Sequence, residues 1–343
     1  MKSKLYLKLL IAALPALVIV SIYIINDPFK VIYHYNSFVG KDGKNYVTLN
    51  KDYTGTEMYI SNKEKYAYDS YVFGSSRCRY YRVDKLKKYI DGKSFYHFDA
   101  YLEGLSGVAQ KVNFIHAKGM HIKNALLVFD IDLFKSLENP KGHIYRKHPL
   151  TSGESISDFQ IINFKDFLDV TFLSAYLKFL ATGKISNESI ANGIMDTATV
   201  IHNVQTNEED FTLIENMINA DPEKYYAGQK DLSAKRDTIE RMEVSVILAE
   251  QKKLLFGIKK VLNEDNTNYK VVISPLFDQK RLNTQDMAFL DSLFGHGKVY
   301  NFSGKNKLTD DVHNYYEKSH YRLSVADYII DSIYGKKEME TGR

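Results

Sequence analysis

Two short segments near opposite ends of the chain carry the residue types of a serine nucleophile and its base. Residues 71–77 read Tyr-Val-Phe-Gly-Ser-Ser-Arg, and residues 316–321 read Tyr-Glu-Lys-Ser-His-Tyr. A serine attacks an acyl carbon when a histidine accepts its proton and a carboxylate orients the imidazole. The two segments therefore predict a hydrolase or acyl transferase, with Ser76 as nucleophile, His320 as base and Glu317 as orienting acid.

A second carboxylate and histidine pair lies a few residues earlier, where Asp310 and Asp311 precede His313. We favour His320, because Tyr321 leads directly into a predicted closing helix that would fix the imidazole. The alternative is that both pairs are solvated surface turns. The segment around Ser76 also lacks the Gly-x-Ser-x-Gly elbow, which argues against an ordinary α/β-hydrolase.

The elements that must position these residues alternate between strands and helices. Apolar runs predict five strands, at residues 71–73, 94–98, 124–129, 269–274 and 298–302, and helices at 77–90, 107–118, 284–294 and 324–333. This alternation is typical of an α/β three-layer sandwich with a five-stranded parallel sheet of the flavodoxin-like kind. Ser76 would lie at the carboxyl end of the first strand, where open α/β sheets bind ligands. Helix onset at Arg77 would offer backbone N–H groups to an oxyanion.

The alternation stops at about residues 131–268, and we expect a large, mostly helical insertion there within one domain of residues 28–343. Residues 164–180 are aromatic and amphipathic, with too many charges for a membrane span; core packing is their favoured use, and a position on a membrane surface is the alternative. Residues 235–262 carry apolar side chains at helical spacing. They predict one long helix that packs back on the sheet.

Residues 1–27 predict a transmembrane signal anchor. The apolar run 9–25 follows Lys2, Lys4 and Lys8, and no small-residue cleavage site follows it. The flanking lysines favour a cytoplasmic amino terminus. We therefore expect a single-pass protein of the inner or cytoplasmic membrane, with a periplasmic or extracellular catalytic domain. A buried core helix is the alternative.

Composition narrows the function classes. The 46 basic and 42 acidic residues give a net charge of +4 without a long basic tract, so nucleic acid is not an expected partner. The single Cys78 excludes an internal disulfide and sites built on cysteine pairs, and we interpret it as a small buried apolar residue. His313, His320 and the nearby acids form no complete ligand set, so we predict no metal and no cofactor.

Taken together, these segments resemble the SGNH (GDSL-like) hydrolase superfamily. The resemblance rests on Gly-Ser-Ser at 74–76, Glu-x-x-His at 317–320 and the five strands, and it covers residues 68–335 apart from the insertion. It is closest to a membrane-anchored, extracytoplasmic branch that includes teichoic-acid D-alanylation and alginate O-acetylation proteins. The resemblance implies addition or removal of O-acyl groups on a cell-surface or exported polysaccharide through an acyl-enzyme. It also implies an acyl donor as substrate and other envelope membrane proteins as partners.

The resemblance extends to the oxyanion hole with one departure. The family's oxyanion glycine would fall at Gly104 or Gly107, but Asp130 stands where the family places an asparagine donor. An ionised aspartate only accepts hydrogen bonds and would repel an oxyanion. Either backbone groups complete the hole, Asp130 has another task, or the chain is a catalytically lapsed member that binds glycan or scaffolds a polysaccharide export complex. Glutamate instead of the usual aspartate at 317 is a milder departure.

Overall fold

The computed structural model describes residues 2–39, 45–138, 140–187, 189, 195, 203–233, 236 and 238–335. The chain divides into two compact units. The first comprises Met1–Asn50, Gly142–Ile144 and Glu154–Val200, and the second comprises Lys51–Lys141, Tyr145–Gly153 and Ile201–Arg343. All five predicted strands belong to the second unit, and so do the residues expected to carry chemistry.

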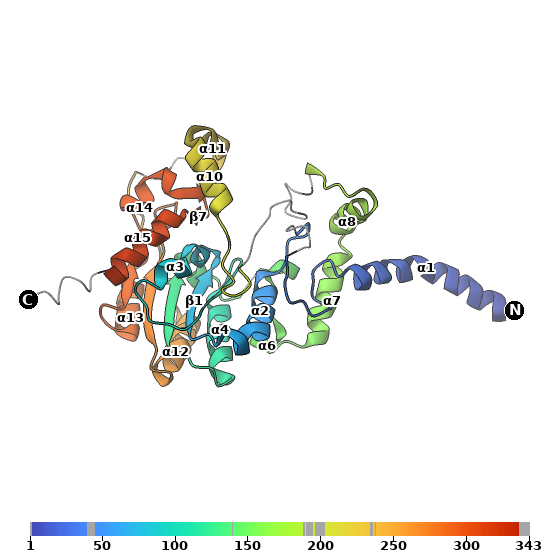
Figure 1. The fold of residues 1–343 in the computed structure, drawn as a ribbon, viewed down its shortest axis with the longest axis horizontal. Helices are drawn as coiled ribbons and strands as arrows, with labels where there is room; N and C mark the ends of the chain where they lie inside the picture. Colours follow the sequence, from blue (N-terminus) through green and yellow to red (C-terminus); the bar gives the residue numbers. More distant parts are fainter. Residues whose placement is uncertain are drawn as a thin grey trace, which may run out of the picture. The chain divides into compact units, whose positions relative to one another are not determined.

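The second unit is built on a five-stranded parallel sheet (Figure 1). Its strands are β1 (Ser70–Ser75), β2 (Phe95–Ala100), β3 (Asn124–Phe129), β4 (Asn268–Ile273) and β5 (Val299–Asn301), in the spatial order β2-β1-β3-β4-β5. This confirms the predicted α/β fold and parallel sheet. The order is that of flavodoxin-like sheets, in which ligands bind where the order reverses, between the first and third strands.

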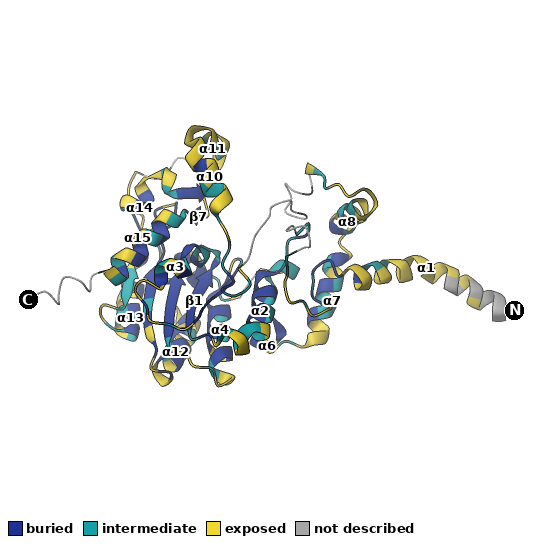
Figure 2. Cartoon of the chain, viewed as in Figure 1, coloured by how far each residue is buried: buried dark blue, intermediate teal, exposed yellow. Residues whose placement is uncertain are grey.

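Two hydrophobic clusters cover the opposite faces of this sheet. Side chains alternate along β1, so Tyr71 and Phe73 pack in one cluster and Val72 packs in the other. The first cluster includes side chains of α2 (Lys51–Tyr66), α4 (Leu105–Ala117), α12 (Ala249–Glu264) and α13 (Thr284–Phe294). The second includes those of α3 (Val83–Leu86) and α15 (Leu323–Tyr334). Strands β1, β2 and β3 are buried along their whole length, as the dark blue of the sheet in Figure 2 shows.

Two predicted helices differ from the structure. Residues 77–90 form a short 3-10 helix, η1 (Ser76–Tyr80), and the single turn of α3 instead of one helix. Residues 235 and 237 of the helix predicted for 235–262 lie outside the described residues, and in the described part the helix begins only at Ala249. The reason is Asp286 in the first turn of α13, whose carboxylate accepts hydrogen bonds from the Ser245 hydroxyl at 2.6 Å and from the amides of residues 246 and 247 at 2.7 and 3.3 Å. These bonds hold residues 245–247 in a non-helical conformation.

The region expected as an insertion is mostly helical. Before α12 it contains α5 (Ile131–Lys135), η2 (His143–Tyr145), α6 (Pro149–Ser152), α7 (Ile156–Phe167), α8 (Val170–Thr182), α10 (Thr212–Ala220), α11 (Pro222–Gly228) and η3 (Lys230–Ser233). Helices α7 and α8 belong to the first unit and the others from α10 onward to the second. The amphipathic run 164–180 thus spans two helices, because Asp169 caps α8 by accepting from the amides of residues 171 and 172.

The first unit contains α1 (Lys2–Asn26), α7 and α8. Near its carboxyl end α1 packs through Tyr23, whose ring lies 5.1 Å from Phe164 and 4.9 Å from Phe167. Elsewhere α1 exposes large apolar side chains, such as Leu17 and Ile25. Of the helices that the structure describes, none contains a stretch long and apolar enough to cross a membrane. The transmembrane anchor predicted for residues 1–27 is therefore not supported by the structure.

Candidate active site

Ser76 lies at the carboxyl edge of the sheet, directly after β1 and at the start of η1. Gly74 permits this placement, because a Cβ at that position would lie 2.3 Å from the Val128 carbonyl oxygen of the adjacent strand. The side chain of Ser75 caps η1 by accepting from the amide of Arg77 at 3.5 Å. The serine therefore lies beside the reversal between β1 and β3, where flavodoxin-like sheets bind their ligands.

A small antiparallel hairpin brings the predicted base to Ser76. Its strands are β6 (Tyr315–Glu317) and β7 (His320–Tyr321), with Glu317 opposite His320. The hydroxyl oxygen of Ser76 lies 2.8 Å from Nε2 of His320, and Nδ1 of the same ring hydrogen-bonds Glu317 Oε1. The Ser319 amide donates to the other oxygen of Glu317 at 2.6 Å. The structure thus brings Ser76 together with His320, 244 positions later in the chain, and with Glu317, in the series expected of a nucleophile, a base and an orienting acid.

The surroundings favour a neutral imidazole and an ionised carboxylate. Burial lowers the pKa of His320, the positive charges of Arg79 and Arg77 lower it further, and the bond with Glu317 opposes them only in part. Burial by itself raises the pKa of Glu317, but the hydrogen bonds from His320 and Ser319 and the charge of Arg79 bring this pKa below its usual value. A neutral histidine held by a carboxylate can accept the proton of a serine at neutral pH.

Asp130 forms an ion pair with Arg77 and offers no hydrogen-bond donor to Ser76. Its carboxylate is fully buried, forms an ion pair with the Arg77 guanidinium at 3.0 Å and accepts from the Ser75 hydroxyl at 3.1 Å. Its other oxygen caps α5 by accepting from the Leu133 amide at 2.8 Å. The carboxylate is therefore neutralised by a cation and bound by three donors.

Arg77 in turn connects β3 to the hairpin. Its Nε donates to the Ser319 carbonyl at 3.0 Å, and its remaining nitrogen pairs with Asp132 at 3.0 Å. The hydroxyl of Tyr321 donates to the Arg77 carbonyl at 2.9 Å. The contacts with Ser319 and Tyr321 connect the segment that carries Ser76 to the hairpin that carries His320. The sequence predicts only a backbone role for Arg77, and nothing in its spacing from Asp130 indicates this side-chain network.

The two glycines expected in the oxyanion hole are held in other contacts. The amide of Gly107 donates to the Gly104 carbonyl at 3.1 Å inside α4, and a Cβ at 107 would collide with Glu103 and Lys147. Gly104 caps α4, and a Cβ there would lie 2.6 Å from the Ser136 carbonyl oxygen. Both positions are thus explained by close packing. The backbone donor expected at Arg77 stays a prediction, and its amide donates to the Ser75 hydroxyl at 3.5 Å.

His313 does not take part in this arrangement. It lies in η4 (Val312–Asn314), is exposed, and pairs with Asp311 at 2.8 Å through Nδ1. Its ring packs edge-on against Tyr226 at 4.6 Å. The structure therefore places Asp311 and His313 as a surface pair, and it is His320 that contacts the serine.

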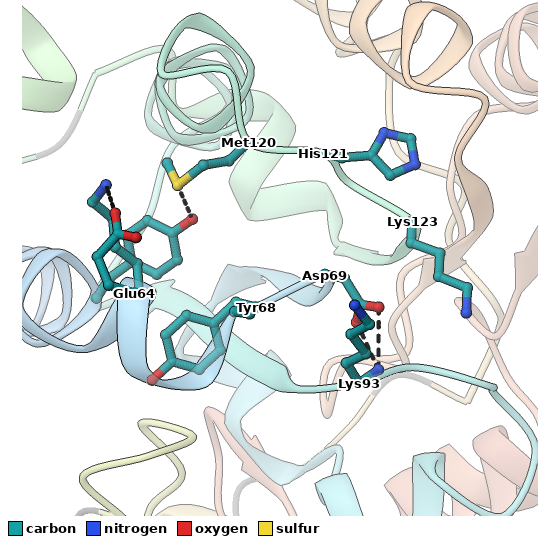
Figure 3. A pocket seen from close by; sticks show the side chains of 10 residues that line it. Glu64, Tyr68, Asp69, Lys93, Met120, His121 and Lys123 are labelled. Atoms are coloured by element: carbon teal, nitrogen blue, oxygen red, sulfur yellow. Dashed lines mark hydrogen bonds and ion pairs between the residues drawn. The ribbon is translucent and has the colours of Figure 1, made fainter.

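A cavity of about 460 Å³ lies at the opposite edge of the sheet (Figure 3). It is lined by the residues that precede three strands, Asp69 before β1, Lys93 before β2 and Lys123 before β3, together with Tyr68 and Met120. The Asp69 carboxylate is already engaged there by the Lys93 amide, at 3.0 and 3.1 Å. Because parallel strands begin at one edge and end at the other, this cavity is not part of the Ser76 site.

The fold and the site define a doubly wound α/β protein with a serine, a histidine and a glutamate in hydrogen-bonded series at the carboxyl edge of its sheet. A comparison with models of known protein families found no match, and a comparison with curated proteins found no significant relative. The chemistry of the protein is therefore inferred from this geometry.

Proposed function

We propose that the protein is a serine esterase or acyltransferase that works through an acyl-enzyme on Ser76. The observation that carries the proposal is the hydrogen-bonded series from the Ser76 hydroxyl through His320 to Glu317. Surface histidines pair with carboxylates often, as His313 does, but a second ring nitrogen at 2.8 Å from a serine at a ligand-binding edge is the arrangement of nucleophilic catalysis.

In the proposed reaction His320 takes the proton of Ser76 as the serine oxygen bonds to the acyl carbon. The tetrahedral intermediate collapses when His320 returns that proton to the leaving oxygen, and the acyl group stays on Ser76. A water molecule or a sugar hydroxyl then gives its proton to His320 and attacks the acyl carbon, and His320 passes the proton to the Ser76 oxygen as the bond between that oxygen and the acyl carbon breaks. Glu317 stays ionised throughout and holds Nδ1 of the imidazole. The amides at the start of η1 and the positive charge of Arg77 are the groups that support negative charge near Ser76.

The substrate that we propose is an O-acyl group on a cell-surface or exported polysaccharide, with envelope membrane proteins as partners. Its support is the resemblance of residues 68–335 to SGNH proteins of that kind. We place the reaction outside the cytoplasm, with α1 as the membrane attachment. Support for this placement is the lysine flank of α1 and its exposed apolar side chains, among them Leu14 and Leu17.

The catalytic proposal is tested with a fluorophosphonate probe on the full chain, followed by mass spectrometry of the labelled peptide. We expect an adduct on Ser76 that is lost in Ser76→Ala and reduced by about 10³-fold or more in His320→Ala. The matched control is His313→Ala, which removes an exposed histidine of the same region and should label like the wild type. No adduct on Ser76 in a folded wild-type chain would overturn the proposal.

The membrane placement is tested separately. The full chain should stay with carbonate-washed membranes, and Leu17→Lys, which puts a charge in the exposed apolar part of α1, should release it. Protease added outside intact cells or spheroplasts should digest the second unit. Recovery of the wild-type chain in the soluble fraction, or protection of the second unit from that protease, would contradict this placement.

One observation favours a second candidate, a lapsed member of the same fold that binds glycan or scaffolds an export complex. Asp130 occupies the position of the expected asparagine donor and is committed to Arg77. Under this alternative Ser76→Ala and His320→Ala would leave the cellular function of the chain unchanged. Loss of that function in both variants, with the fold retained, would exclude it.

A further inference from the structure

A second group of chemically competent side chains lies next to the nucleophile segment. Cys78 belongs to η1, two residues after Ser76, and His97 and Asp99 belong to β2. His97 and Asp99 are two residues apart on a strand, so their side chains point to the same face of the sheet. One donor atom from each residue, a sulfur, a nitrogen and an oxygen, lies within 4.8 Å of the other two.

These three side chains are buried and poorly satisfied. Cys78 and His97 are 0% exposed and Asp99 is 1% exposed. Among the described residues, neither ring nitrogen of His97 and neither carboxylate oxygen of Asp99 has a hydrogen-bond partner. Buried polar groups are nearly always paired, because water no longer solvates them. Four unsatisfied atoms in one cluster therefore call for a bound group.

The ammonium of Lys51 approaches this cluster without filling it. The ammonium of Lys51 is 3.9 Å from Asp99, at the limit of an ion pair, but it is 3.1 Å from Glu209 and 3.2 Å from the Asn207 carbonyl. The shorter contacts with Glu209, which Arg79 also binds at 3.0 Å, and with the Asn207 carbonyl hold the ammonium of Lys51 away from Asp99. The Asp99 carboxylate thus lies close to the His97 ring and the Cys78 sulfur without a hydrogen bond to any described residue.

We propose that Cys78, His97 and Asp99 bind a divalent cation of the zinc class. Thiolate and imidazole ligands select such cations over magnesium or calcium, which prefer oxygen ligands alone. Donors at zinc distances of about 2.0–2.3 Å lie up to about 3.8 Å apart in a tetrahedron. The present spacing therefore needs side-chain adjustments of about 1 Å, and the second Asp99 oxygen or a water fills the fourth position.

The consequence of such a site is structural and local to the nucleophile. The cation would tie η1, which begins with Ser76, to the edge strand β2 from the side opposite the Arg77 contacts. On binding, Cys78 loses its thiol proton to solvent, and the thiolate and carboxylate charges offset the cation. The sequence indicates this site only weakly, because the ligands come from two segments and only the alternation of His97 and Asp99 on a strand marks them.

The test uses the full chain purified without a polyhistidine tag, with metal content measured by mass spectrometry and with Co²⁺ as the spectroscopic probe. We expect about one bound cation per chain, and a near-ultraviolet thiolate-to-cobalt charge-transfer band after exchange. Because Cys78 is the only cysteine, this band reports on that residue alone. Absence of any bound cation together with no cobalt uptake, or cobalt uptake without the band, would overturn the proposal.

Variants separate this site from the proposed active site. Cys78→Ala should abolish the band, and His97→Ala should weaken Co²⁺ binding by about 100-fold or more. His313→Ala, the exposed-histidine control, and Ser76→Ala should both keep the band and the affinity. If a ligand variant does not fold, the wild-type cobalt spectrum still decides the question. A His97→Ala chain that folds and binds Co²⁺ as tightly as the wild type would exclude His97 as a ligand.

Discussion

Replacing Asp130 with asparagine distinguishes two roles for this residue. If Asp130 stands in the way of an oxyanion donor, Asp130→Asn would restore the donor and increase the reactivity of Ser76. If its main task is to hold Arg77, the same change would break a buried ion pair and weaken both the fold and the site. The structure favours the second outcome, because the carboxylate is fully buried and lies 3.0 Å from the guanidinium.

The expected loss follows from the contacts that remain. Removing one partner of a buried ion pair costs about 3–5 kcal/mol. Arg77 keeps Asp132 and the Ser319 carbonyl, and an asparagine oxygen can still cap α5, so we expect the lower end, about 3 kcal/mol. At about 2–4 °C per kcal/mol, the melting temperature of the second unit should fall by roughly 6–12 °C. Asp130→Ala also loses the cap and should cost about 1 kcal/mol more.

The measurement follows thermal unfolding of the second unit by the reaction of Cys78 with a thiol reagent, since this residue is buried in that unit. Labelling of Ser76 by the fluorophosphonate probe is measured on the same samples and should fall by about 10- to 100-fold as the hairpin loses its anchor. The matched control is Asp132→Asn, the exposed partner of the same arginine, which should cost less than about 1 kcal/mol. An Asp130→Asn chain of wild-type stability with faster labelling would refute this reasoning.

Three further predictions concern Glu317, His320 and Asp286. Glu317→Gln should reduce Ser76 labelling by about 10³–10⁴-fold and move the acid limb of its pH profile to lower pH, because the carboxylate raises the pKa of His320. The folded chain lowers the pKa of His320, so the unfolded chain binds a proton at a higher pH than the folded chain does. The free energy of unfolding should therefore fall as the pH drops below about 6.5. His320→Asn should reduce that loss, measured by unfolding at a series of pH values. Asp286→Ala should cost about 3 kcal/mol in thermal unfolding through its lost charged hydrogen bonds, while Ser76 labelling of the folded chain stays within about twofold of the wild type.

Elements with strong local signals were predictable from the sequence. The strand at 124–129 and the helix at 284–294 have the bounds of β3 and α13, because a continuous apolar run and a clear helical period leave few alternatives. For residues 238–248 the helix predicted from the apolar spacing is wrong. Their apolar spacing suits a helix, but Asp286, about forty residues later, takes the amides of residues 246 and 247. Such a long-range hydrogen bond leaves no local mark in the sequence.

Some residues of the candidate site were also predictable from the sequence, and others were not. Ser76, Glu317 and His320 could be named because nucleophile, base and acid have recognisable types and local spacing, and their meeting follows from the topology of a parallel sheet. The ion pair and hydrogen bonds of the Arg77 side chain could not be predicted from the sequence. Its partners Asp130 and Ser319 are 53 and 242 positions away, and any arginine after a strand reads as a solvated surface residue.

The two arginines that follow Ser76 show how an acidic residue at 130 is compatible with nucleophilic chemistry. Arg77 neutralises Asp130, so the buried carboxylate adds no net negative charge beside the serine. Arg79 is paired with Glu209 at 3.0 Å, yet its charge still lowers the pKa of His320. The charges of Arg79 and Arg77 lower the pKa of His320, which favours a neutral base before attack, and positive charge also favours a negative oxygen after it. We infer that the arginines supply by charge part of what an asparagine supplies by a hydrogen bond, and that Arg77→Met would therefore harm Ser76 labelling more than Asp132→Asn does.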